Sequence, residues 1–97
     1  MKRNEAVGKL RRYAGRLRSL GATSLFLFGS TAKNKATRRS DIDLFVDYDP
    51  KKLTLMELVG IKQLLENELG VEVDVTTRDS LHPLLRDEIE QSAIRVF

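Results

Sequence analysis

The chain has no cysteine and only one histidine among its 97 residues. Disulfides and thiolate metal sites are therefore excluded, and a metal ion would have to be held by oxygen ligands or by that histidine. No apolar run approaches the ~20 residues that a membrane helix needs, and the basic start of the chain lacks the apolar stretch of a signal peptide. These absences predict a cytoplasmic protein with no membrane segment.

The length and composition predict one folded domain over residues 1–97. A chain of this size removes only about 60 to 68% of its unfolded surface from water, which is too little for two separate cores. Its 41% hydrophobic and 32% charged residues are typical of a folded domain and not of a disordered tail.

The basic residues are concentrated at the start of the chain. Residues 1–20 carry seven basic side chains and one acidic one, a net charge of +6, whereas residues 21–97 carry ten basic and thirteen acidic ones, a net charge of −3. This basic segment could be a solvated surface, or it could meet an acidic protein or nucleic acid. Nucleic acid is disfavoured because no cluster of aromatic residues is available for base stacking.

The spacing of apolar residues predicts seven helices and strands. In order, they are a helix over residues 4–20, strands over 23–28 and 41–46, a helix that ends at Gly70, a strand over 71–76, a helix that begins at Pro83 and a strand over 94–97. Thr54 and Glu57 have the spacing of a capping box at the start of the central helix, and Leu85 and Ile89 should face inward from the last one. This order predicts an α/β (α+β) fold, a small mixed sheet with helices packed on one face.

Three aspartates fall on the predicted strands. Asp41 and Asp43 lie two residues apart in the second strand, so both should project from the face opposite Ile42 and Leu44. If the valines of the third strand share that apolar layer, Asp74 projects with the other two acids. Because neighbouring carboxylates resist joint ionisation, a divalent cation would stabilise the set, and oxygen ligands favour Mg²⁺ or Mn²⁺.

Gly29 and Ser30 directly follow the first predicted strand. A glycine there lets the backbone approach a ligand closely, and a serine hydroxyl can bind a phosphate oxygen. A Gly-Ser pair after a strand is usually only a turn. Here ten residues separate it from Asp41-Ile42-Asp43, and this spacing gives the pair a more specific meaning.

The spaced motif resembles the signature of the DNA polymerase β-like nucleotidyltransferase superfamily, which is Gly-Ser, about ten residues, Asp-x-Asp and a later strand acid. The small size, the segment SDIDLFVDYD and the tail SLHPLLRDEIEQSAIRVF are more narrowly similar to the minimal nucleotidyltransferases (MNT), the antitoxin partners of HEPN-domain ribonuclease toxins. The resemblance covers nearly the whole chain and implies the palm-like fold of that superfamily.

The resemblance implies an enzyme that transfers AMP from ATP to a tyrosine hydroxyl of a HEPN toxin. By position, Asp41 and Asp43 would bind Mg²⁺, and Asp74 would bind one metal and orient or deprotonate the acceptor hydroxyl. Gly29 and Ser30 would hold the β- and γ-phosphates. Two alternatives stay open, namely an antitoxin that acts by binding alone and a nucleotidyltransferase of a small molecule. The single histidine, His82, is expected to cap or precede the last helix.

Overall fold

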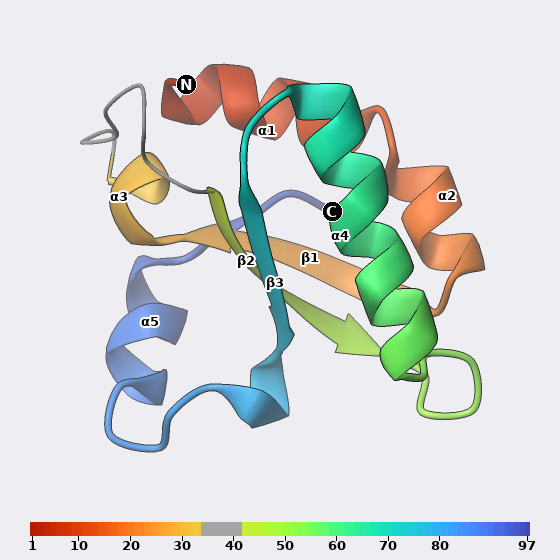
Figure 1. Ribbon diagram of the computed structural model, residues 1–97. Helices are drawn as coiled ribbons and strands as arrows, with labels where there is room; N and C mark the ends of the chain where they lie inside the picture. The colour runs from red at the N-terminus through yellow and green to blue at the C-terminus, as the bar shows by residue number, and fades with distance from the viewer. Residues whose placement is uncertain (34–41) are drawn as a thin grey trace.

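A mixed four-stranded sheet forms the centre of the computed structural model, which describes residues 1–33 and 42–97 (Figure 1). The strand order is β3-β2-β1-β4. β2 runs parallel to β3 and antiparallel to β1, and β4 runs antiparallel to β1. The elements are α1 (Arg3–Arg11), α2 (Ala14–Ser19), β1 (Ala22–Phe28), α3 (Gly29–Ala32), β2 (Ile42–Tyr48), α4 (Leu55–Leu69), β3 (Val73–Thr77), the 3₁₀ helix η1 (Arg78–Ser80), α5 (Arg86–Ser92) and β4 (Ile94–Arg95).

One face of the sheet packs against α1, α2 and α4 and forms the main core. Alternate residues of each strand point to this face, among them Leu27, Leu44 and Val73, and all three are fully buried. The helices contribute Leu10, Leu17, Ile61 and Leu65 from their apolar stripes. The predicted class of a small mixed sheet with helices on one face is confirmed.

The opposite face of the sheet carries an aromatic cluster as well as the acids. Phe45 lies between Asp43 and Asp47 on this face and is fully buried. The Phe26 ring stacks on it at 4.8 Å between centroids, and the Phe28 ring lies at 5.7 Å. The Arg78 guanidinium covers the stack, 4.8 Å from the Phe26 centroid and 5.0 Å from that of Phe45. This second face is therefore a small core with a cationic cover.

The single helix predicted over residues 4–20 is wrong, because the structure has two helices there. The N–H groups of Arg12 and Tyr13 bond to carbonyls three residues back, Lys9 O and Leu10 O, and this tighter turn separates α1 from α2. Leu10 and Leu17 both stay buried across the break. Their spacing of seven residues suits a straight helix equally well, so the apolar pattern gave no sign of the turn.

The last helix also differs from its prediction. It begins at Arg86, not at Pro83, because residues 83–85 form a turn in which Leu85 N–H donates to His82 O at 2.9 Å. Leu85 is 50% exposed, so the expectation that it faces inward is wrong. Figure 1 shows α5 away from α1, α2 and α4.

Helix α4 begins and ends where the sequence predicts. The N–H of Thr54 donates to Glu57 Oε2 at 3.1 Å, and the Thr54 side chain completes the capping box. Gly70 ends the helix in the left-handed conformation, with φ of 69°. β3 starts at Val73, two residues later than predicted. Across the described part of the chain, every helix is too short or too polar to span a bilayer.

Candidate active site

Gly29 lies against the carboxylate of Asp43. The backbone turns at Gly29 with φ of 75°, directly after Phe28, which is the register partner of Asp43 in the β1–β2 pair. A Cβ atom at position 29 would overlap Asp43 Oδ2 and would lie 3.2 Å from its Cγ. The glycine therefore serves two purposes, since it permits the left-handed turn and leaves room for the acid.

Asp43 and Asp74 are direct neighbours across β2 and β3. They are register partners in the parallel pair, so their side chains leave the same face of the sheet. The Asp74 side chain is 66% exposed, which leaves it accessible to a ligand. The expectation that these two acids share a face is confirmed. Asp41, the third acid of the predicted set, lies outside the described residues.

Ser30 is the second residue of α3 and follows the glycine turn. With four residues, α3 is too short for its helix dipole to carry an argument, so the expected hold on phosphate depends on Gly29 and the Ser30 hydroxyl. The next side chain, Thr31, is buried, and its Oγ1 has no hydrogen-bond partner within the described ranges. A phosphate contact at Ser30 stays a prediction.

The donor set fits a hard divalent cation. Asp43 and Asp74 offer carboxylate oxygens from adjacent strands, and the glycine beside them leaves space that any other side chain would fill. Mg²⁺ typically takes one or two protein carboxylates and keeps its other positions for water and substrate phosphates. Within residues 1–33 and 42–97, no group of three or more acidic or histidine side chains converges, and Asp41 as a third ligand stays a prediction.

Lys62 of α4 reaches this site, although the sequence pattern does not indicate it. Its Nζ donates to Val73 O at 2.7 Å and lies 4.0 Å from Asp74 Oδ1. The only signal in the sequence is the four-residue spacing between Lys62 and Glu66, which indicates an ion pair on one helix and nothing about a strand.

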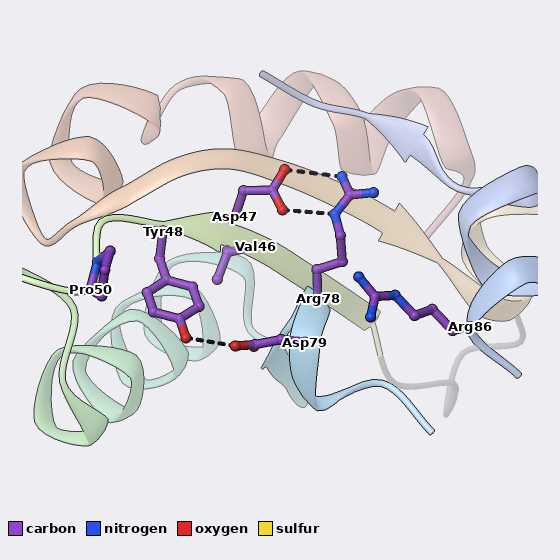
Figure 2. A pocket seen from close by; sticks show the side chains of 7 residues that line it. All are labelled: Val46, Asp47, Tyr48, Pro50, Arg78, Asp79 and Arg86. Carbon is purple, nitrogen blue, oxygen red and sulfur yellow. Dashed lines mark hydrogen bonds and ion pairs between the residues drawn. The ribbon is translucent and has the colours of Figure 1, made fainter. Parts of the chain in front are cut away.

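Arg78 is a second residue that the sequence analysis missed, and it lines a cavity of about 320 Å³ farther along β2 (Figure 2). Its Nε and Nη2 donate to the two carboxylate oxygens of Asp47 at 2.7 and 3.0 Å, and its Nη1 lies 3.7 Å from Glu90 of α5. The bond to Asp47 raises the pKa of the Arg78 guanidinium. The cavity is lined by Val46, Asp47, Tyr48, Pro50, Arg78, Asp79 and Arg86.

Two other polar side chains have local roles. Figure 2 shows the Tyr48 hydroxyl directed at Asp79, to which it donates at 2.8 Å, and this bond raises the pKa of the tyrosine. His82 Nδ1 accepts from the Leu84 N–H at 3.2 Å in the turn before α5. His82 therefore precedes the last helix, as expected, but it does not cap α5, whose N-cap is Leu85.

Comparison with known proteins gives the class of this protein. The nucleotidyltransferase domain family matches residues 9–96, and the chain belongs to this family. Within it, the chain is similar to the minimal members. A solved chain provisionally described as a minimal nucleotidyltransferase is 31% identical, with a TM-score of 0.84 over 97% of this chain and 95% of that one.

Similar curated proteins carry a more specific name. A Methanocaldococcus jannaschii protein, provisionally named a protein adenylyltransferase, is 45% identical over 79% of this chain and 82% of its own length. The protein adenylyltransferase MntA of Thermococcus cleftensis is 31% identical over 63% of this chain and 61% of its own length.

A more distant structure shares the fold. It is a toxin–antitoxin crystal structure with AMP-PNP, in which the matching chain is 22% identical with a TM-score of 0.70, over 100% of this chain and 73% of that one.

Proposed function

We propose that the protein is a Mg²⁺-dependent adenylyltransferase that moves AMP from ATP to a tyrosine hydroxyl of a HEPN ribonuclease toxin and thereby acts as its antitoxin. The observation that carries this proposal is the pairing of Asp43 with Asp74 across two parallel strands, with Gly29 packed against Asp43. Mn²⁺ could replace Mg²⁺, because both ions prefer oxygen ligands.

The motif residues would divide the work of this reaction. Asp41 and Asp43 would bind the metal, and Asp74 would bind metal and would accept the proton of the tyrosine hydroxyl or orient that group. Gly29 and Ser30 hold the β- and γ-phosphates. The tyrosine oxygen forms a bond to the α-phosphorus as the bond to pyrophosphate breaks, and pyrophosphate leaves in line. When bound, the metal stabilises the negative charge on the transferring phosphate.

The comparisons support the nucleotide and the partner. Curated relatives are named protein adenylyltransferases. Solved neighbours are toxin–antitoxin structures, one of them with AMP-PNP and another named as MntA–HepT. ATP as substrate and a toxin as partner follow as our proposal for this chain. The HEPN class and the tyrosine acceptor come from the motif resemblance.

A labelling experiment tests the proposal. Incubation with ATP labelled in its α-phosphate, Mg²⁺ and the cognate toxin should label the toxin, and chelation of Mg²⁺ should abolish the label. Asp41→Asn, Asp43→Asn and Asp74→Asn should each lower the labelling rate by about 100-fold or more. Asp87→Asn, which changes an exposed acid of α5, should keep the wild-type rate. A wild-type protein that neither labels the toxin nor binds Mn²⁺ with ATP would contradict the proposal.

Neutralisation by binding alone is the second candidate. It is favoured by the exposed apolar side chains Leu55, Met56 and Val59 at the start of α4, which are 76%, 81% and 45% exposed and are suited to a protein contact. The doubly substituted Asp41→Asn/Asp43→Asn protein separates the two candidates. If it protects cells from the toxin as well as the wild type does, binding alone suffices.

A further inference from the structure

We infer that Lys62 is a positioning residue for Asp74, and this inference rests on the role proposed above for that acid. Lys62 lies in the middle of α4, which packs against the apolar face of the sheet, whereas Asp74 projects from the opposite face. The lysine side chain passes around the outer edge of β3 and brings its Nζ to 4.0 Å from Asp74 Oδ1. It thus connects a helix on one face to an acid on the other.

The backbone contacts of Lys62 are the firmest part of this connection. Its Nζ donates to Val73 O at 2.7 Å, and Glu66, one helical turn later, accepts from Val73 N–H at 3.2 Å. Both polar groups of the Val73 backbone are therefore bonded to α4 side chains. Lys62 and Glu66 are in turn 3.5 Å apart. Because Val73 directly precedes Asp74, this pair fixes the backbone from which the Asp74 side chain departs.

The charge of Lys62 has a second effect on the acids. Its ammonium group lies 4.0 Å from Asp74 Oδ1, next to the site proposed for a divalent cation. The same positive charge opposes the approach of a divalent cation. Loss of this charge should therefore offset the loss of a well-placed Asp74, so metal binding should not weaken when Lys62 is replaced.

A matched pair of lysines makes the test specific. Lys9 of α1 is 42% exposed, as Lys62 is, and it also pairs with a glutamate four residues away, Glu5 at 3.4 Å. Within the described residues, Lys9 has no hydrogen bond or ion pair with β3, Asp43 or Asp74. Lys9→Met therefore removes an equivalent helix-surface ion pair, whereas Lys62→Met also removes the contacts with Val73 and Asp74. Lys62→Arg keeps a long cationic donor.

Three readouts are compared for wild type, Lys62→Met, Lys62→Arg and Lys9→Met. Lys62→Met should lower the turnover of AMP transfer about tenfold per folded molecule, and Mn²⁺ affinity, measured with AMP-PNP by electron paramagnetic resonance, should not weaken. Amide hydrogen exchange at residues 73–75 should accelerate about tenfold. Lys62→Arg should recover most of each change, and Lys9→Met should match the wild type.

The outcomes separate this inference from the proposed function. If wild type transfers AMP and Lys62→Met matches it in turnover or in exchange, the positioning role is wrong. If wild type neither transfers AMP nor binds Mn²⁺, the proposed function is wrong. The exchange comparison then decides by itself whether Lys62 holds this part of β3.

Discussion

At the scale of single residues, Gly29 is the position where the addition of one methyl group should disturb the candidate active site most. Two independent constraints meet there, a positive φ and the nearby Asp43 carboxylate. Gly70 has nearly the same φ, 69° against 75°, but a Cβ there would meet nothing within 4 Å. The two glycines therefore allow backbone strain and steric overlap to be measured separately.

We predict that Gly29→Ala and Gly70→Ala both lower the free energy of unfolding by about 1–2 kcal/mol, because an L-residue resists a left-handed backbone. Only Gly29→Ala should also displace Asp43 and lower AMP transfer per folded molecule by about 100-fold. Urea unfolding and the labelling assay measure the two effects. Equal activity in the two variants would show that the space beside Asp43 has no catalytic importance.

Gly60→Ala serves as a positive control for the same experiment. Gly60 lies inside α4, and a Cβ there would also meet nothing within 4 Å. Because alanine restricts the unfolded chain and favours helix, this variant should gain about 0.5–1 kcal/mol of stability. A loss would show that α4 tolerates no added side chain at this point.

At the scale of an element, α4 depends on its capping box. The hydrogen bond from the Thr54 hydroxyl, with help from backbone N–H groups, lowers the pKa of the Glu57 carboxyl. A carboxyl with a depressed folded-state pKa contributes stability that is fully present above its unfolded pKa of about 4.3 and is lost as the pH falls through the folded value. The cap should therefore weaken in acid and be intact at neutral pH.

We predict that Thr54→Ala is less stable than wild type at pH 7 and that the difference narrows between about pH 5 and pH 3, where Glu57 becomes protonated in both proteins. Thr54→Ser keeps a hydroxyl donor and should follow the wild-type pH profile. Urea unfolding midpoints measured across this range provide the comparison. A constant difference at every pH would mean that Glu57 contributes nothing through its charge.

At the scale of the whole molecule, Arg78 connects parts of the chain that the sequence separates. It joins η1 to β2 through Asp47, to α5 through Glu90, and to β1 through the Phe26 ring. Its side chain is 28% exposed and that of Asp47 is 38% exposed, so solvent screens the pair in part. The forked contact and the ring contact should matter more than the charge alone.

We predict that Arg78→Lys lowers the free energy of unfolding by about 1–2 kcal/mol, because lysine keeps the charge but cannot make two parallel bonds to Asp47 or lie flat over the rings. Arg86→Lys is the matched control. Arg86 is 44% exposed and donates to the same Glu90 at 2.8 Å, and its replacement should change stability by less than about 0.5 kcal/mol. Equal losses of stability in the two variants would show that the contact with Glu90, which both arginines share, causes the effect.

The sequence predicts the features of this fold that depend on residues near one another along the chain, and it does not predict contacts between distant segments. The placement of Gly29, Asp43 and Asp74 followed from strand alternation and from the order of turns, which are local patterns. Lys62 and Arg78 could not be found in that way. Their contacts depend on how α4 crosses β3 and on where η1 returns over β2, and no spacing in the chain encodes these distances. The exposed Leu85 has a similar origin, since a turn and not a helix follows His82.

The side chains at Val73 also limit how other molecules can join the sheet. Another strand could extend the sheet beyond β3 only by displacing Lys62 and Glu66 from the Val73 backbone. At the other edge of the sheet, the edge strand β4 is only two residues long. Sheet extension between copies is therefore disfavoured within the described structure. In the proposed reaction, an acceptor protein would approach the face that bears Asp43 and Asp74, and it would present a side-chain hydroxyl to these acids instead of a backbone segment.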